Sequence, residues 1–388
     1  MMIGRAAIVR GHAMLGLLVP LSAYAQAVRL VRVEVPNASH PAAWTNVTRV
    51  RELSNGKVLV LDARDQSVKL VDFQAGTAKL VGRKGNGPGE YVMPTGLLAL
   101  PGDTTVLFDE ANSGRPSIIG PAAVFTGDVL RLRADGPPIV NAFAFTDERG
   151  RIYRGGSVAG AMGFPVERWS RTPLKTDTIA YYHSREGCGA KAKESSAGGS
   201  RGNMARRGPS AAFVATDDWA VAPDGRVAVV CPNPYAARLF ANGKTITGRL
   251  IPYDPVPVTD AEKQEWRDAH SGPVATLRFS NDGKMTAGYE QHRIAEPAEW
   301  PLTLPPFVRE PEFHRSLYFA PDGNLWIARA NAAGTGSLYD VIGPDANLRL
   351  RVLLPRRSRL VGFGRTAMYV VQRDDDDIEH FQRYAIPR

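Results

Sequence analysis

The residues that most resemble a catalytic motif are a serine flanked by glycines, Gly198-Gly-Ser-Arg-Gly202. A G-x-S-x-G sequence is typical of hydrolases in which a strained turn between a strand and a helix exposes the serine nucleophile. Here the serine lies in a Gly/Ser/Ala-rich stretch, with no strand pattern before it and no helix pattern after it. Because those two elements create the strain, their absence from the pattern argues against a serine hydrolase.

The sequence also gives no strong indication of a cofactor site. The Gly85-Asn-Gly-Pro-Gly89 run lacks the Lys-Ser/Thr pair of a P-loop and precedes no helix pattern. The seven histidines are scattered, without the His or Cys spacing of a zinc site. The acidic run Asp374-Asp-Asp-Asp377 lacks the glycine and spaced ligands of a calcium loop, so we interpret it as a solvated turn before the last strand. We predict no cofactor, with a divalent cation such as calcium as the alternative.

The first 25 residues are expected to be a secretory signal peptide. Arg5 and Arg10 precede an apolar run over 13–21 and an Ala23-Tyr-Ala25 cleavage site. The run is too short to cross a bilayer, and no later apolar stretch reaches about 20 residues, so we expect no transmembrane segment. No cysteine follows the cleavage site to carry a lipid anchor. We therefore expect residues 26–388 to form one domain, either periplasmic or secreted.

An exported protein is exposed to oxidising conditions, which bears on its two cysteines. Cys188 and Cys231 are separated by 43 residues, and an oxidising compartment favours a disulfide over two free thiols. In the chain-entropy model, closing such a loop stabilises the fold by about 4 kcal/mol. The mass change on alkylation without reductant tests this expectation.

Much of the positive charge of the chain lies in one segment. The formal net charge of +9 falls to +7 without the two leader arginines, and residues 183–210 carry six Lys or Arg against two Glu. Because this segment is rich in Gly, Ser and Ala, we interpret it as a flexible basic loop, with a basic arm for an acidic polymer or lipid headgroups as the alternative. No aromatic residues alternate with its charges, so nucleic-acid binding is not indicated.

The elements that must position any site are visible as a repeated pattern. The chain has 38 Gly and 29 Pro, which suit short strands and tight turns better than long helices. A short apolar stretch, a turn at or near Gly and a second β-rich run recur at residues 53–62, 100–109, 145–153, 221–230, 319–328 and 362–371. The Asn-Gly and Asp-Gly steps predict tight hairpin turns. Each copy is therefore expected to be a hairpin.

Several copies continue into a second hairpin, as at residues 67–82, 235–251 and 338–354. Four antiparallel strands per unit, with almost no helical pattern between them, predict an all-β fold of the β-propeller type. Three of the five intervals between the turn glycines, of 46, 48 and 41 residues, match one blade, whereas the intervals of 75 and 98 residues require insertions. We predict six blades, with seven as the alternative because Asn281-Asp-Gly283 could mark another.

The longer intervals predict two insertions. The basic loop 183–210 lies in the first, and the second spans 252–307. Thr259 and Glu262 form a capping box that predicts one short helix near 259–270. Because a propeller closes by joining its two ends in one blade, we expect residues 28–35 to pair with 378–386.

One segment is more specific than the repeats. Residues 81–91, Val-Gly-Arg-Lys-Gly-Asn-Gly-Pro-Gly-Glu-Tyr, resemble the glycine-rich GPGE signature of an exported bacterial six-bladed β-propeller family, an NHL/TolB-like group. The resemblance continues at 257–263, 304–307, 322–326 and 377–384. It implies six blades over nearly the whole mature chain, but it implies no reaction.

The GPGE segment is expected to connect the first blade to the second on the face that also carries the loops after each second strand. Its structural residues are Gly82, Gly85, Gly87, Pro88, Gly89 and Glu90. This placement predicts ligand-binding residues around one mouth of the channel, namely Arg64, Arg83, Lys84, Glu90, Asp109, Arg154 and Arg329. The alternative is that the glycines shape a crossover whose Glu90 only forms structural hydrogen bonds.

The sequence therefore favours a binding protein over an enzyme. We expect a monomeric, exported propeller that holds a small molecule or an unknown protein partner at one mouth of its channel, without catalysis. The alternative is a lactonase-like hydrolase or a lyase, which would need a divalent metal in the channel, for example on Asp62, Glu90 and Asp109.

Overall fold

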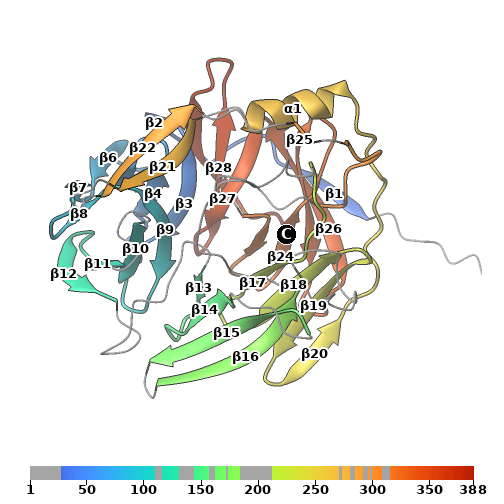
Figure 1. The fold of residues 1–388 in the computed structure, drawn as a ribbon, viewed down its shortest axis with the longest axis horizontal. Coiled ribbons are helices and arrows are strands. Elements are labelled where there is room, and N and C mark those ends of the chain that lie inside the picture. Colours follow the sequence, from blue (N-terminus) through green and yellow to red (C-terminus); the bar gives the residue numbers. More distant parts are fainter. Residues whose placement is uncertain are drawn as a thin grey trace, which may run out of the picture.

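The computed structural model describes residues 28–109, 116–130, 144–156, 162–171, 174–183, 212–270, 273–279, 285–291, 296–297, 299–307 and 315–388. Within these residues, six antiparallel sheets form a ring around a central channel, which confirms the predicted six-bladed propeller (Figure 1). The predicted signal peptide and nearly all of the basic loop 183–210 lie outside the described residues. No helix in the described part of the chain is long and apolar enough to cross a membrane.

Each blade consists of four strands, which follow one another from the channel outward. Blade 1 is β3 (Val47–Glu52), β4 (Val58–Asp62), β5 (Ser67–Asp72) and β6 (Thr77–Leu80). Blade 2 is β9 (Pro94–Ala99), β10 (Thr105–Asp109), β11 (Ser117–Ile119) and β12 (Phe125–Val129). Blade 3 is β13 (Phe145–Thr146), β14 (Ile152–Gly155), β15 (Phe164–Arg171) and β16 (Leu174–Tyr182). Blade 4 is β17 (Asp218–Val221), β18 (Val227–Pro232), β19 (Tyr235–Ala241) and β20 (Lys244–Thr247).

The last two blades also use the start of the described chain. Blade 5 is β23 (Leu317–Phe319), β24 (Leu325–Ala328), β25 (Gly336–Ile342) and β26 (Leu348–Arg356), extended by β1 (Arg29–Arg32), which pairs parallel with β26. Blade 6 is β27 (Ser358–Phe363), β28 (Ala367–Arg373), β29 (Glu379–Ala385) and β2 (Ala38–Trp44).

The continuous apolar runs of the sequence are explained by burial on both faces of each sheet. In β4, Val58 and Val60 pack in a cluster with blade 6, whereas Leu59 and Leu61 pack in a cluster with blade 2. All four are fully buried. Since successive side chains of a strand point to opposite faces, a Val-Leu-Val-Leu run supplies two blade interfaces at once. The described core consists of six such clusters, one between each pair of adjacent blades.

The predicted hairpin turns after the inner strands gather on one face of the ring, which we call the turn face. The turn glycines of blades 1 to 5 have the positive φ that the pattern predicts, between 69° and 91°. Neighbouring turns contact one another: Arg365 Nη2 donates to Ser54 O at 2.6 Å, and Ser54 N donates to Asp103 Oδ2 at 2.8 Å. The opposite face, called the crossover face, carries the loops after the second strands and the connections between blades.

The strand that pairs with the last strand and closes the ring is not the predicted one. The outer strand of blade 6 is β2, paired antiparallel with β29, whereas the expected residues 28–35 include β1 on the edge of blade 5. Pro41 disfavours a strand in the sequence pattern, but β2 is an edge strand whose register is interrupted between Ser39 and Ala43. Trp44, fully buried between blades 6 and 1, anchors it.

The described residues of the second insertion form no further blade. It contains the predicted helix α1 (Asp260–His270) and a two-stranded hairpin of β21 (Pro273–Phe279) and β22 (Met285–Gln291), so the seven-blade alternative is wrong. The capping box is present: Thr259 Oγ1 donates to Glu262 Oε2 at 2.5 Å, and Ala261 N donates to Thr259 Oγ1 at 3.2 Å. Glu262 Oε1 also accepts from Ala333 N at 2.9 Å, which ties the helix to blade 5 on the crossover face.

Candidate functional site

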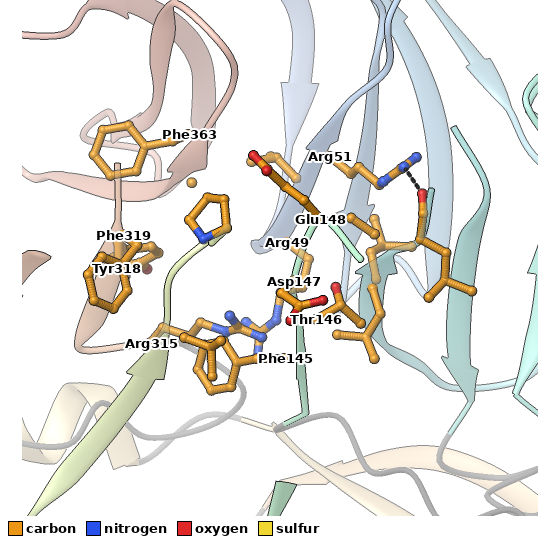
Figure 2. Close-up of a pocket in the computed structure, with 18 of the residues that line it drawn as sticks. Arg49, Arg51, Phe145, Thr146, Asp147, Glu148, Arg315, Tyr318, Phe319 and Phe363 are labelled. Atoms are coloured by element: carbon orange, nitrogen blue, oxygen red, sulfur yellow. Dashed lines mark hydrogen bonds between the residues drawn. The ribbon is translucent and has the colours of Figure 1, made fainter. Parts of the chain in front are cut away.

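A cavity of about 470 Å³ lies in the central channel and reaches the turn face. We call it the channel cavity. All six inner strands or their turns line it, as Figure 2 shows for the residues drawn. Its volume is within the range of small-molecule sites, roughly 300 to 1,000 Å³. The cavity opens at the face opposite to the mouth at which the sequence predicts binding.

Two arginines from distant parts of the chain meet in this cavity. Arg49 lies on β3 of blade 1, and Arg315 lies two residues before β23 of blade 5, on the other side of blade 6. Figure 2 shows their side chains approaching each other across the channel. Arg315 donates to Ala144 O at 3.0 Å, and its guanidinium lies 3.9 Å from the centroid of the Phe145 ring. Arg49 donates to Thr48 O at 2.8 Å.

A bulge in β3 directs Arg49 into the channel. Val47 pairs with Asp62 but Arg49 pairs with Leu61, so Thr48 is the extra residue. A bulge re-aims the side chains on either side of it. Val47 consequently stays in the core between blades 1 and 6, while Arg49 and Val50 line the channel cavity.

Burial disfavours the charged forms of both guanidinium groups, whereas the negative charge of Asp218 favours that of Arg315. Burial, and to a lesser extent the positive charge of Arg315, lower the pKa of Arg49 to about 9. Burial also lowers the pKa of Arg315 to about 10. Both side chains remain charged at neutral pH, but their charged forms are less favoured than in water. An anion placed between them would offset both effects.

The remaining walls are aromatic and polar. Phe145, Tyr318, Phe319 and Phe363 line the channel cavity, and they offer apolar surface beside the two charges. Glu148, which is exposed, lies at the turn face. The cavity therefore combines a cationic centre with ring-shaped apolar contacts.

Two other charged residues of the cavity have structural partners. Arg51 donates to Leu100 O at 3.0 Å and to Thr105 Oγ1 at 2.8 Å, which fastens blade 1 to blade 2. Asp147, also a cavity residue, accepts from Arg151 Nε at 2.5 Å and from Tyr153 OH at 2.9 Å. These groups hold the turns that surround the cavity.

The seven residues predicted at a channel mouth lie at or after the ends of second strands or in the crossover between blades 1 and 2, all on the crossover face, and none of them lines the channel cavity. Asp109 is buried and accepts from Val92 N and Met93 N at 2.9 and 2.8 Å. Arg154 pairs with Glu167 at 2.9 Å. Arg329 pairs with the fully buried Asp340 at 3.4 Å. Binding by these residues at the crossover mouth stays a prediction.

The GPGE segment is a crossover between blades 1 and 2, as expected. It contains β7 (Arg83–Lys84) and β8 (Glu90–Tyr91), which pair parallel. Glu90 accepts from Gly87 N and from Arg83 Nε, both at 2.7 Å, and these two contacts lower the pKa of Glu90. A Cβ on Gly85 would lie 2.2 Å from Glu90 Oε2, so glycine is needed where this carboxylate folds back.

Lys84 and Arg64, which were also predicted at the channel mouth, are exposed. Lys84 donates to Gln66 Oε1 at 2.6 Å, which joins the crossover to the loop after β4, whereas Arg64 lies on the surface of that loop. The contacts of the segment therefore account for its shape, and its binding role stays a prediction.

The other sequence motifs are placed as follows. Asp374 accepts from Ile378 N at 2.9 Å and lies 2.7 Å from His380 Nε2, which makes the acidic run a capped turn. No group of three or more potential metal ligands occurs among the described residues. Cys231 is disulfide-bonded, and Cys188 and the glycine-flanked serine lie outside the described part of the chain.

The arginines of the channel cavity were missed by the sequence reasoning. Arg49 lies in Val47-Thr-Arg-Val-Arg-Glu52, directly before the first repeat, and Arg315 lies four residues before the start of the fifth. The available signal was position, since residues near the start of each hairpin belong to or adjoin the inner strands, which surround the channel. That signal was not used because the hairpin turns, rather than the inner strands, defined the repeats.

Comparisons with known proteins add no chemistry to this geometry. No protein-family model matches the chain, and no curated protein matches it. A Bacteroides fragilis structure named as an exported protein has 10% identity over 92% of this chain and 100% of its own, with a TM-score of 0.43. Virginiamycin B lyase of Staphylococcus aureus has 11% identity over 88% and 96%, with a TM-score of 0.38. Regucalcin of Agrobacterium tumefaciens, a calcium-binding protein, has 11% identity over 92% and 95%, with a TM-score of 0.33.

Proposed function

We propose that this protein is an exported, non-catalytic binding protein that holds a small anionic ligand in the channel cavity. The observation that carries the proposal is the meeting of Arg49 and Arg315 inside a cavity of about 470 Å³. Two buried guanidinium groups side by side repel each other, and an anion bound between them would be attracted to both. Guanidinium groups bind carboxylate and phosphate oxygens in a fork geometry.

The aromatic walls indicate the rest of the ligand. Phe145, Tyr318 and Phe319 lie beside the arginines and favour a flat, apolar ring over a bare inorganic ion. The proposed ligand class is therefore a ring that carries a carboxylate or phosphate group.

The test is calorimetric titration of the purified protein with phenylacetate and phenyl phosphate, and with neutral benzyl alcohol for comparison. We expect binding of at least one anion and none of the alcohol. Arg315→Gln should weaken binding by about 10- to 150-fold, because a hydrogen bond to a charged group is worth roughly 1.5 to 3 kcal/mol. Lys79→Gln, on the exposed outer strand of blade 1, is the matched control and should leave the affinity unchanged.

Two results would contradict the proposal. Equal binding of the anions and the alcohol would show that the arginines do not select the ligand. A stoichiometric divalent cation in the purified protein, together with lactone turnover that is lost on its removal, would instead support the metal-dependent hydrolase or lyase.

A further inference from the structure

A second cavity, of about 610 Å³, lies between blades 3 and 4. We call it the interblade cleft. Its lining comes from the β13–β14 turn, strands β15 and β16, the β17–β18 turn and the β19–β20 turn. Figure 1 shows these two blades as neighbours in the ring. The cleft shares the turn face with the channel cavity but is lined by different residues.

A hydrogen bond between two turns separates the cavities. Glu148 N donates to Pro223 O at 2.9 Å, and both residues line the channel cavity. The next residue of each turn, Arg149 and Asp224, lines the interblade cleft instead. The wall is reinforced by Tyr153, whose hydroxyl lies 3.3 Å from Gly225 O. Ligands in the two cavities therefore contact different side chains.

The interblade cleft is rich in positive charge. Besides Arg226, four of its lining residues are cations from both blades, namely Arg149, Arg151, Arg168 and Lys244. Its one lining carboxylate, Asp224, is paired with Arg226 at 2.7 Å, and Arg226 extends toward blade 5, where it donates to Gly323 O at 3.3 Å. The carboxylate of Asp224 is therefore paired with Arg226, whose guanidinium also contacts blade 5.

Two of the four cations are held in place by carboxylates behind them. Arg151 pairs with the buried Asp147 at 2.5 Å, and Arg168 pairs with Asp177 at 2.9 Å. Arg149 and Lys244 are exposed, and neither has a carboxylate partner among the residues that the structure describes. The cleft therefore contains two fixed guanidinium groups and two cations available to a ligand.

Gly225 packs closely against one of the cations of the cleft. A Cβ on Gly225 would lie 2.4 Å from Arg151 Nη2, so a larger residue at this position would displace the guanidinium. Gly225 also has a φ of +91°, a conformation that other residues rarely adopt.

Neutral polar groups surround the charges. Thr178, Asn242 and Thr245 line the interblade cleft and are exposed. Hydroxyl and amide groups of this kind donate and accept hydrogen bonds to sugar hydroxyls, whereas guanidinium groups bind phosphate and sulfate oxygens.

We infer that the interblade cleft is a second binding site, which takes a phosphorylated or sulfated sugar. Arg149 and Lys244 would bind the oxyanion group, oriented by Arg151 and Arg168, and the threonines and Asn242 would bind the ring hydroxyls. The volume of about 610 Å³ suits one or two sugar rings.

The experiment is titration of the full chain with glucose 6-phosphate, glucose 6-sulfate, neutral glucose and inorganic phosphate, followed by calorimetry. We expect binding of at least one charged sugar at least tenfold tighter than binding of inorganic phosphate, and no detectable binding of glucose. Comparison of glucose 6-phosphate with glucose 6-sulfate shows which of the two oxyanion groups the cleft binds.

The variant is Arg149→Gln with Lys244→Gln, which leaves the ion pairs of Arg151 and Arg168 intact. We expect at least tenfold weaker binding of the charged sugar. The control is Arg29→Gln with Lys79→Gln, which removes the same charge from exposed positions of β1 and β6 and should leave the affinity unchanged. Arg315→Gln should also leave it unchanged, so failure of the channel proposal and failure of this one are distinguishable.

Four outcomes would overturn the inference. They are no binding of either charged sugar at millimolar concentration, equal affinity for inorganic phosphate, an unchanged affinity in the cleft variant with its melting temperature preserved, and binding of a single-stranded oligonucleotide in place of the sugars.

Discussion

Removing the carboxylate of Asp340 should destabilise the propeller more than any exposed substitution, because Asp340 joins blades 4 and 5 beneath the second insertion. Its side chain is fully buried and accepts from Arg351 Nε at 2.9 Å and from Tyr235 OH at 2.9 Å. Arg329 Nη1 lies 3.4 Å away and its side chain is only 6% exposed. Burial and the negative charge of Asp340 raise the pKa of Tyr235 well above its usual value, so its hydroxyl remains a donor.

The magnitude follows from what Asp340→Ala would leave behind. Two arginines lose their carboxylate, and a buried tyrosine hydroxyl loses its acceptor. Breaking a buried ion pair by removing one partner costs about 3 to 5 kcal/mol. Asp340→Asn keeps the shape and one acceptor oxygen but removes the charge, so we expect a loss of about 2 kcal/mol.

The assay is urea unfolding followed by tryptophan fluorescence. The matched control is Asp375→Asn: this aspartate also pairs with an arginine, at 2.8 Å, but is fully exposed, so the urea midpoint should not change. A loss below about 1 kcal/mol for Asp340→Ala would refute the reasoning, since it would mean that the two arginines regain water or find other partners. Such a result would mean that Arg329 does not need its ion pair with Asp340, and it would favour the ligand-binding role that the sequence predicts for Arg329.

Two further predictions concern the helix cap and the GPGE crossover. Hydrogen bonds from Thr259 and from Ala333 N lower the pKa of Glu262 to about 2 from an ordinary value of 4.5, so its contribution to stability is complete above pH 4.5 and is lost as the pH falls toward 2. The difference in urea midpoint between the wild type and Glu262→Gln should therefore shrink from pH 6 to pH 2, and a constant difference would contradict the assignment. Gly82→Ala should cost about 3 kcal/mol, because Gly82 has a φ of +74° and a Cβ there would lie 2.5 Å from Phe125 and 2.7 Å from Gly89 O. Gly56→Ala, at a φ of +80° with nothing within 4 Å, should cost only about 1 kcal/mol in the same unfolding assay, and equal costs would argue against the close packing of the crossover.

The elements that follow from the sequence are those whose causes are local. Glycine at positive φ specifies the hairpin turns, and uninterrupted runs such as 58–61 require burial on both faces of a strand. Thr259 and Glu262 lie within one turn of each other, so the helix cap was predictable as well. These features imply the blade, and their repetition implies the ring.

Contacts across the ring follow from the three-dimensional arrangement of the blades. It placed β2 rather than β1 beside the last strand, because the burial of Trp44 between two blades outweighs the disfavoured Pro41. It also brought Arg49 and Arg315, which are 266 residues apart, into one cavity. Such contacts depend on blade number, on the direction of the inner strands and on one bulge at Thr48. A local pattern carries none of these, because each is set by how all six blades close around the channel.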